Sequence, residues 1–258
     1  MPTITQLRDM IAVRAAEAEC PYPEKADIES SSDPYAGRFH GSAGAWMLEV
    51  QEAIALSLLA ATSPLHILDV GGGHGQLARP LVRAGHHVTV LSSHPACRHR
   101  IHDLIHPDHC AFDVGDVVAL PYPDRSFDAV FCFRLTTHCS VWPQLISELC
   151  RVARHTVILD YPTKQSLNAI APLLFSAKKK IETNTRTWTL FTHRDIRQAF
   201  ATHRFLPASR KGQFFFPMVI HRIIKNRTLS RALETASRTL GLNHLFGSPV
   251  IARFDRNP

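Results

Sequence analysis

The 258-residue sequence lacks any uninterrupted run of eighteen apolar residues, so it predicts no membrane-spanning helix. Its first ten residues also lack the apolar core of a secretory signal. There is no internal repeat and no low-complexity tract. These absences predict a globular, cytoplasmic protein, and a hydrophobic content of 45% is enough for one sizeable core.

Cysteine pairs with the spacing of metal or redox sites are also missing, because none of the six cysteines forms a C-x-x-C motif. Four histidines do follow one another at roughly helical spacing, with a cysteine at each end: Cys97, His99, His102, His106, His109 and Cys110. Imidazole and thiolate are zinc ligands, but Pro107 should end the helix before the last histidine. We therefore expect a solvated, histidine-rich helix face, reduced thiols and no metal site.

Acidic residues are scarce in the second half of the chain. Residues 151–258 contain 5 Asp and Glu against 19 Lys and Arg, a net charge of +14, whereas residues 1–150 contain 17 against 10, a net charge of −7. A basic half predicts contact with an anion, such as a charged substrate, a membrane surface or nucleic acid. The alternative is that solvated helix faces simply meet the acidic half.

Short apolar runs alternate with amphipathic segments along the chain. The runs predict strands over 65–70, 87–91, 110–114, 127–133, 156–161, 213–220 and 249–254. The amphipathic segments predict helices over 3–19, 45–61, 76–83, 142–152 and 194–200. This alternation is typical of an α/β fold with a doubly wound, mostly parallel, seven-stranded sheet and helices on both faces.

The segment 20–43 is rich in proline, serine and glycine, which predicts a loop. Its part Tyr35–His40 is expected to fold over a ligand as a lid. We expect N-terminal helices and this lid over 1–60, and one domain over 61–258 with a helical insert at about 222–247. The apolar residues of the insert share one face: Leu229, Leu233, Ala236 and Leu240. That face either packs on the core or rests on a membrane surface.

The first predicted strand runs directly into a glycine-rich turn, Asp69-Val70-Gly71-Gly72-Gly73-His74-Gly75. Glycines let the backbone turn sharply and let a ligand come close. A dinucleotide turn has the form G-x-G-x-x-G, but here the last glycine would fall on Gln76. Asp69 would repel a phosphate and suits a cation, such as the amino group of an amino-acid-like cofactor. The alternative is a tight strand–helix turn that binds no ligand.

Residues 65 to about 161 resemble the core of class I S-adenosylmethionine-dependent methyltransferases, near the ubiquinone/menaquinone and type 11 group. The turn matches the family's first motif, an acidic residue followed by G-x-G-x-G. Gly115-Asp116 and then Leu120 to Asp128 are similar to the family's G-D-x-x-x-L-P-x-x-x-x-S-F-D segment. A shorter match is Glu148-Leu149-Cys150-Arg151-Val152, similar to E-L-x-R-V.

The resemblance implies a Rossmann-like fold and S-adenosyl-L-methionine as cofactor. Asp69 would organise the amino end of its methionine, and four glycines would pass under it: Gly71, Gly72, Gly73 and Gly75. Asp116 would accept from the adenine amino group with the backbone of Val117 nearby, and Phe133 would also line the cofactor site. The alternative for Asp116 is a loop or helix-capping aspartate.

The chain departs from the family at the end of the second strand. The family has an acidic residue there that binds both ribose hydroxyls, and Ser92 takes its place. A serine can hold one hydroxyl but lacks the two-oxygen clamp of a carboxylate. Residues 1–60 and 163–258 match the family motifs poorly, so the resemblance says little about the substrate.

Open α/β sheets bind ligands at the carboxyl ends of their strands. After the fourth strand, His138 is the candidate general base, because the unperturbed pKa of histidine lies near neutrality. The alternative is a helix-capping or surface histidine. After the fifth strand, Asp160 and Tyr161 either orient a substrate or pack as a strand-end pair.

The leading hypothesis is methyl transfer to a small, anionic or amphiphilic molecule, with peripheral contact to an anionic membrane as a further expectation. The basic half motivates an RNA methyltransferase as the alternative. Against nucleic acid as a partner, no N-P-P-Y-like tetrapeptide follows the fourth strand. Ser92 motivates a third reading, a non-catalytic fold that binds the cofactor or a partner.

Overall fold

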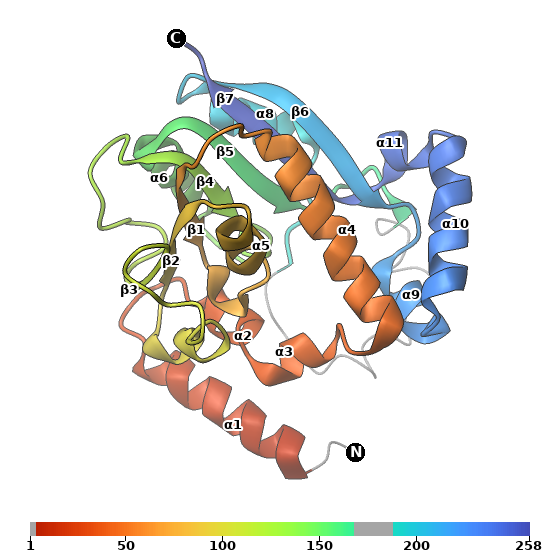
Figure 1. The fold of residues 1–258 in the computed structure, drawn as a ribbon, viewed down its shortest axis with the longest axis horizontal. Coiled ribbons are helices and arrows are strands. Elements are labelled where there is room, and N and C mark those ends of the chain that lie inside the picture. Colours follow the sequence, from red (N-terminus) through yellow and green to blue (C-terminus); the bar gives the residue numbers. More distant parts are fainter. Residues whose placement is uncertain (1–3, 168–187) are drawn as a thin grey trace.

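The computed structural model describes residues 4–167 and 188–258, and it contains a seven-stranded sheet with helices on both faces (Figure 1). The strands are β1 (His66–Val70), β2 (His87–Ser92), β3 (Cys110–Val114), β4 (Phe127–Cys132), β5 (Ala153–Tyr161), β6 (Phe205–Phe214) and β7 (Ser248–Arg256). Their order is β3-β2-β1-β4-β5-β7-β6, and only β7 runs antiparallel to its neighbours. The predicted doubly wound, mostly parallel sheet is confirmed.

The helices precede, connect and follow the strands. The α-helices described are α1 (Ile4–Glu19), α2 (Ala26–Ser30), α3 (Asp33–Gly37), α4 (Gly41–Leu59), α5 (Ala78–Arg83), α6 (Trp142–Val152), α8 (His193–Ala201), α9 (Met218–Ile224), α10 (Arg227–Thr239) and α11 (Leu242–Phe246). Two short 3-10 helices, η1 (Gly72–His74) and η2 (Pro95–Arg100), follow β1 and β2. None of the helices described combines the length and hydropathy that a membrane crossing requires.

Two hydrophobic cores lie on the two faces of the sheet. On one face, Leu58 of α4 and Leu81 of α5 pack against the sheet, and Figure 1 shows α4 crossing that face diagonally. On the other face, Leu149 of α6 and Phe200 of α8 are fully buried. β1 lies between β2 and β4 at the centre and is covered on both faces, with Leu68 in one core and Ile67 in the other. The chain order reverses beside β1, and such a reversal is where doubly wound sheets bind ligands.

The strand predicted over 213–220 is wrong. The sixth strand covers Phe205–Phe214, and Met218–Ile224 forms helix α9 after Pro217. β6 is an edge strand that pairs only with β7, and its residues 206–211 are exposed. An exposed edge strand needs no apolar run, so residues 206–211 carry no pattern that predicts a strand. The apolar run that follows, Met218–Ile224, is helical.

The loop predicted over 20–43 is also wrong in part, because α2 and α3 lie within it and α4 begins at Gly41. Ser32 caps α3 by accepting a hydrogen bond from Tyr35 N at 3.3 Å, and Pro34 lies in the first turn. These residues favour helix starts as well as turns.

The histidine-rich helix predicted near 99–109 is absent from the described structure. η2 ends at Arg100, turns follow, and His106 N donates to Cys110 O at 2.9 Å in an isolated bridge. Pro107 therefore acts as a turn residue between two hydrogen-bonded positions rather than as the end of a helix.

Helices α9, α10 and α11 follow β6 and precede β7 in the sequence. The buried carboxylate of Glu234 connects the three helices. It accepts hydrogen bonds from Phe215 N (2.9 Å), Phe216 N (3.0 Å) and Asn243 Nδ2 (2.8 Å). His221 Nε2 lies 3.0 Å from the same carboxylate, and both side chains are inaccessible to solvent. Burial acts to raise the pKa of Glu234, but these hydrogen bonds outweigh it and lower that pKa below its usual range.

We predict that Glu234→Gln destabilises the protein by about 2–4 kcal/mol, because an amide cannot accept from all of these donors and leaves some of them buried without a partner. Since the folded pKa of Glu234 lies below the unfolded one, its stabilisation is present above about pH 4 and lost as the pH falls further. Urea unfolding measures both effects. The neighbouring exposed residue gives the control Thr235→Ala, and equal stability of the two variants would contradict this role.

Candidate functional site

The turn after β1 is shaped by its glycines and by one hydrogen bond. Gly71 N donates to Leu91 O at 2.8 Å, and Gly71 and Gly75 both have positive φ, at 74° and 73°. A Cβ built at Gly72 would lie 2.1 Å from Asp69 Oδ2. Glycine at position 72 therefore makes room for the carboxylate of Asp69. The helix predicted to begin at Gln76 begins at Ala78, because η1 occupies the turn first.

Asp69 is a buried carboxylate with no hydrogen-bond partner among the residues that the structure describes. Its exposed fraction is 2%, and burial raises its pKa to about 7. It lines a cavity of about 20 Å³ together with Ser30, Gly71, Gly72, His74, Gln76, Leu77, Phe133 and Arg134. A carboxylate in such a place attracts a cation that can replace the water it has lost.

Arg134 lines the same cavity from the end of β4, and its backbone has a positive φ of 62°. Its N–H donates to Asp160 Oδ1 at 2.6 Å, and its Nη2 donates to Gln51 Oε1 at 2.8 Å and also to Gln76 Oε1. The guanidinium lies 4.5 Å over the ring of Phe39. Its Nη1 is buried and has no hydrogen-bond partner in the part of the chain that the structure describes, so its two N–H groups can bind a ligand.

Asp160 and His74 complete the surroundings of Arg134. Burial raises the pKa of Asp160 to about 6, although the hydrogen bond from Arg134 N acts against it. His74 is packed edge-on against Tyr35 and Phe39, at centroid distances of 5.9 and 6.0 Å. Burial and the nearby Arg134 lower the pKa of His74 to about 2, so its ring is neutral.

The segment 20–40, which we call the strap, covers the carboxyl ends of β1 and β2 (Figure 1). Asp27 is fully buried in it and accepts hydrogen bonds from Ser93 N and Ser93 Oγ, both at 2.6 Å. Glu24 accepts from Ser140 N at 2.8 Å and from Ser140 Oγ. The strap, which includes the expected lid Tyr35–His40, is therefore fastened to the loops after β2 and β4.

Comparison with known proteins identifies the core. Residues 68–159 match the family model described as "Methyltransferase domain". Over these residues the chain contains a methyltransferase domain.

The curated relatives match only part of this chain. A sterol 24-C-methyltransferase of Gibberella zeae is 36% identical over 95 residues, which are 35% of this chain and 25% of that protein. A demethylmenaquinone methyltransferase of Deinococcus radiodurans is 32% identical over 115 residues, which are 41% of this chain and 47% of that protein. The match thus spans less than half the length of these curated relatives.

A solved structure agrees over more of the chain. Magnesium protoporphyrin IX methyltransferase from Synechocystis PCC 6803, with bound SAH, superposes with a TM-score of 0.56 at 17% sequence identity, covering 82% of this chain and 83% of that one. At this identity the likeness shows that the two proteins share a fold.

The methyltransferase domain brings together part of the predicted site. Asp69, Gly71, Gly72 and Phe133 all line the small cavity. A Cβ at Gly73 would instead lie 2.5 Å from Ser31 Oγ of the strap. The same Cβ would lie 2.7 Å from Cys97 Cβ and 2.9 Å from Cys97 O, so contacts within the protein itself require glycine there.

The other predicted residues lie outside the cavity lining. Ser92 and Val117 are fully buried, and Gly75 packs beneath Ile101, which a Cβ would approach to 2.6 Å. Asp116 accepts from Val118 N at 2.9 Å, as a loop-capping aspartate does. His138 is half-buried, with its ring edge-on to Trp188 at 5.9 Å.

Sequence reasoning missed Arg134 and Asp27. Arg134 follows β4 directly, where doubly wound folds place ligand-binding residues, and this position was the available signal. Asp27 lies in a segment that read as a loop, and its partner Ser93 is 66 residues away. No local pattern indicates such a contact.

We predict that Asp69 makes stability pH-dependent. Its folded pKa of about 7 exceeds the unfolded value of about 3.9, so the stability present below pH 4 is lost as the pH rises towards 7. Asp69→Asn cannot ionise. The difference in free energy of unfolding between wild type and variant should therefore change by roughly 2–3 kcal/mol between about pH 5 and pH 8, in favour of the variant at the higher pH. The exposed Asp108→Asn is the control, and a difference independent of pH would refute the shift.

Proposed function

We propose that the protein is an S-adenosylmethionine-dependent methyltransferase that acts on a small molecule. One observation carries the proposal: the cavity at the glycine turn is lined by a carboxylate without a partner, Asp69, and by an arginine with an unpaired Nη1, Arg134. A methionine end carries an ammonium and a carboxylate, which are the complements of these two groups.

In this proposal Asp69 holds the ammonium, Arg134 binds the carboxylate, and Gly71 and Gly72 leave room for the chain between them. The resemblance assigns the remaining contacts to Asp116 and Val117 for adenine, Ser92 for ribose and Phe133 beside the cofactor, with Gly73 and Gly75 shaping the turn. When bound, the cofactor supplies an electrophilic methyl group. His138 is the proposed base that takes a proton from the acceptor.

The methionine end fits the residues present, but the cavity of about 20 Å³ is only large enough for a water molecule. The strap occupies the space at the end of β2, where Asp27 is bound to Ser93. We therefore propose that residues 20–40 act as the lid: the strap opens to admit the cofactor and closes again to exclude water.

The proposed acceptor is a small, anionic or amphiphilic molecule met in the cytoplasm or at an anionic membrane. The relatives named above act, by their names, on a sterol, a demethylmenaquinone and a porphyrin. The charge of +14 over residues 151–258 favours an anionic partner. Leu240, Leu245 and Phe246 of the insert are exposed by 73%, 58% and 43%, which favours contact with an apolar surface.

We predict that the wild-type protein transfers label from radiolabelled S-adenosylmethionine to the small-molecule or lipid fraction of a cell extract. Asp69→Asn should bind the cofactor about tenfold to a hundredfold more weakly in calorimetry, because a charge-assisted hydrogen bond is lost. Asp108→Asn should bind like wild type. Label in the RNA fraction would favour a nucleic-acid methyltransferase, and absence of cofactor binding by the folded wild type would refute the proposal.

We predict that Asp27→Asn tightens cofactor binding by about tenfold, because the amide keeps one acceptor for Ser93 and loses the other, so the strap opens at a smaller cost. Calorimetry measures the affinity, and circular dichroism checks the fold. The control is Asp108→Asn, an exposed carboxylate outside the strap, which should bind like wild type. Weaker binding by Asp27→Asn would instead make Asp27 a cofactor ligand and contradict its role as a latch.

A further inference from the structure

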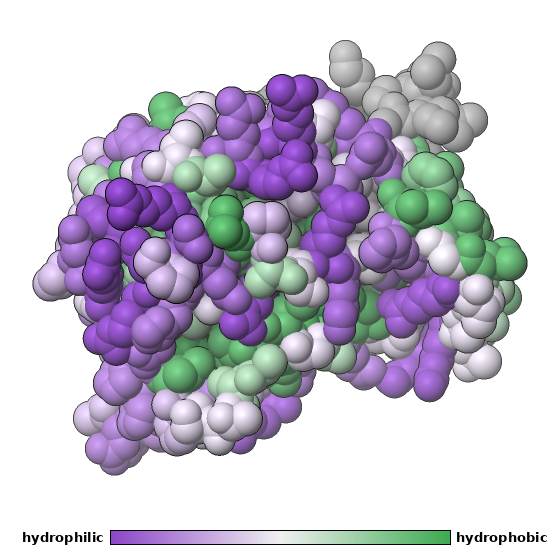
Figure 2. Space-filling model, turned by 90° about the horizontal axis from the view of Figure 1, so that it is seen from above, coloured by the Kyte–Doolittle hydropathy of each residue, from purple (hydrophilic) through white to green (hydrophobic). Residues whose placement is uncertain are grey.

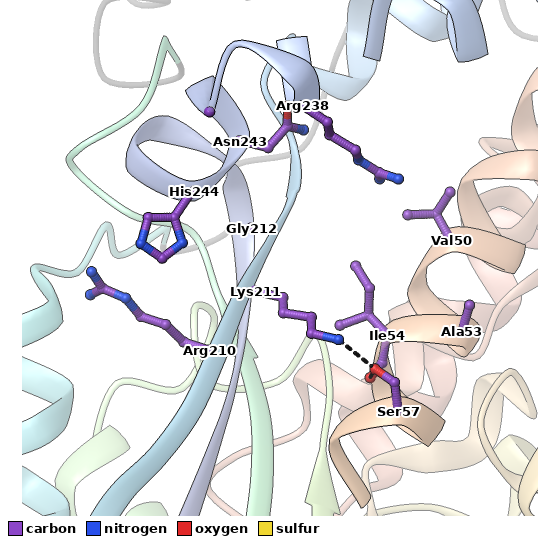
Figure 3. A pocket seen from close by; sticks show the side chains of 11 residues that line it. Val50, Ala53, Ile54, Ser57, Arg210, Lys211, Gly212, Arg238, Asn243 and His244 are labelled. Carbon is purple, nitrogen blue, oxygen red and sulfur yellow. Dashed lines mark hydrogen bonds between the residues drawn. The ribbon is translucent and has the colours of Figure 1, made fainter. Parts of the chain in front are cut away.

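A groove of about 520 Å³ lies between α4, β6 and the α10–α11 pair (Figure 3). It is lined by Val50, Ala53, Ile54, Ser57, Arg210, Lys211, Gly212, Arg238, Gly241, Asn243 and His244. Gln51, which contacts Arg134, lies on the face of α4 that is buried against the sheet. Helical spacing puts residues 50, 53, 54 and 57 on an adjacent side of the helix, so the groove and the contact of Gln51 with Arg134 lie on different sides of α4.

Two cations, Lys211 of β6 and Arg238 of α10, extend into this groove towards α4. Figure 3 shows Lys211 extending towards Ser57 and Arg238 extending towards Val50. Successive residues of a strand point to opposite faces, and Arg210 accordingly lies on the other side of β6, near His244 (Figure 3). Arg210 also lines the groove, but the positive charge that extends towards α4 comes from Lys211 and Arg238.

Neither cation is neutralised. Lys211 Nζ donates to Ser57 Oγ at 3.0 Å, and Arg238 Nη2 donates to the backbone oxygen of Gln213 at 3.2 Å, and both acceptors are uncharged. No Asp or Glu is among the lining residues, and no carboxylate in the described ranges forms an ion pair with either side chain. Both cations keep free N–H donors for an anion.

The groove also has an apolar wall, formed by Val50, Ala53 and Ile54 of α4. Two positive charges opposite one apolar wall suit a ligand with a doubly charged head and a short hydrocarbon part. Arginine and lysine are the side chains that bind phosphate, the arginine through its planar fork and the lysine as a point charge.

We propose that this groove binds a phosphate ester with a short apolar part, at a site separate from the glycine turn and independent of methyl transfer. The phosphate is that of a soluble ester or of a phospholipid headgroup. Three exposed apolar residues, Leu240, Leu245 and Phe246, adjoin the lining residues of α10–α11. Figure 2 shows a hydrophobic group of side chains on the side of the molecule where these helices lie.

The first test titrates inorganic phosphate into the full chain and follows backbone amide signals by NMR. The amides of Gly212 and Gly241, which line the groove, should shift saturably, and sodium chloride of equal ionic strength should leave them unchanged. Lys211→Ala and Arg238→Ala should each weaken the response by about tenfold, because each loses a charge-assisted contact. Arg197→Ala removes an exposed cation from α8 on the opposite face of the sheet and should respond like wild type.

The second test distinguishes the two sources of phosphate. Flotation uses vesicles of phosphatidylcholine alone and vesicles with equal amounts of phosphatidylcholine and phosphatidylglycerol. If the wild type and Arg197→Ala float with the anionic vesicles and Lys211→Ala does not, the site binds a lipid headgroup. A saturable phosphate response without flotation assigns it to a soluble ester.

The proposal is overturned if phosphate shifts no groove amide, or if Lys211→Ala and Arg238→Ala respond like wild type. Cofactor calorimetry on the same two variants separates this inference from the proposed function. Both should bind S-adenosylmethionine with wild-type affinity, because neither residue contacts the cavity at the glycine turn.

Discussion

The carboxylate of Asp69, buried without a partner at the end of the central strand, is the constraint to which the candidate site is fitted. Gly72 has no side chain because any Cβ would meet that carboxylate, and the bond from Gly71 N to Leu91 O fixes the turn around it. An isolated buried charge lowers stability at neutral pH unless a cation reaches it. In the proposed function that cation is the ammonium group of the cofactor, and the turn is less stable without it.

The buried carboxylates of the strap, unlike that of Asp69, accept hydrogen bonds. Asp27 and Glu24 are as buried as Asp69, but each receives a backbone N–H and a hydroxyl, from Ser93 and Ser140. Hydrogen bonds of this kind satisfy a buried carboxylate without a counter-ion. These two carboxylates hold the strap closed, whereas Asp69 beneath it remains available.

The sequence predicted those elements whose pattern of apolar residues or glycines is recognisable within a few residues. β1 and β4 are covered on both faces and read as apolar runs, and the glycine turn has few alternative uses. β6 was missed because an edge strand with exposed residues carries no such run. Arg134 was missed because its contacts come from Gln51, Gln76 and Asp160, which only the fold brings together. The same holds for Asp27 and Ser93.

The fold also keeps the opposite charges of Asp69 and Arg134 from pairing with each other. Asp69 and Arg134 line one cavity, yet burial alone accounts for the raised pKa of Asp69, while Arg134 is held by Gln51, Gln76 and Asp160. Had the two groups paired with each other, neither would attract a ligand, and the cavity would favour no zwitterion. Lys211 and Arg238 line a different cavity from Asp69 and form no ion pair with a carboxylate in the described ranges. Opposite charges in one domain attract each other. Asp69 can bind a cation, and Lys211 and Arg238 can bind an anion, only if the fold keeps them from pairing with each other.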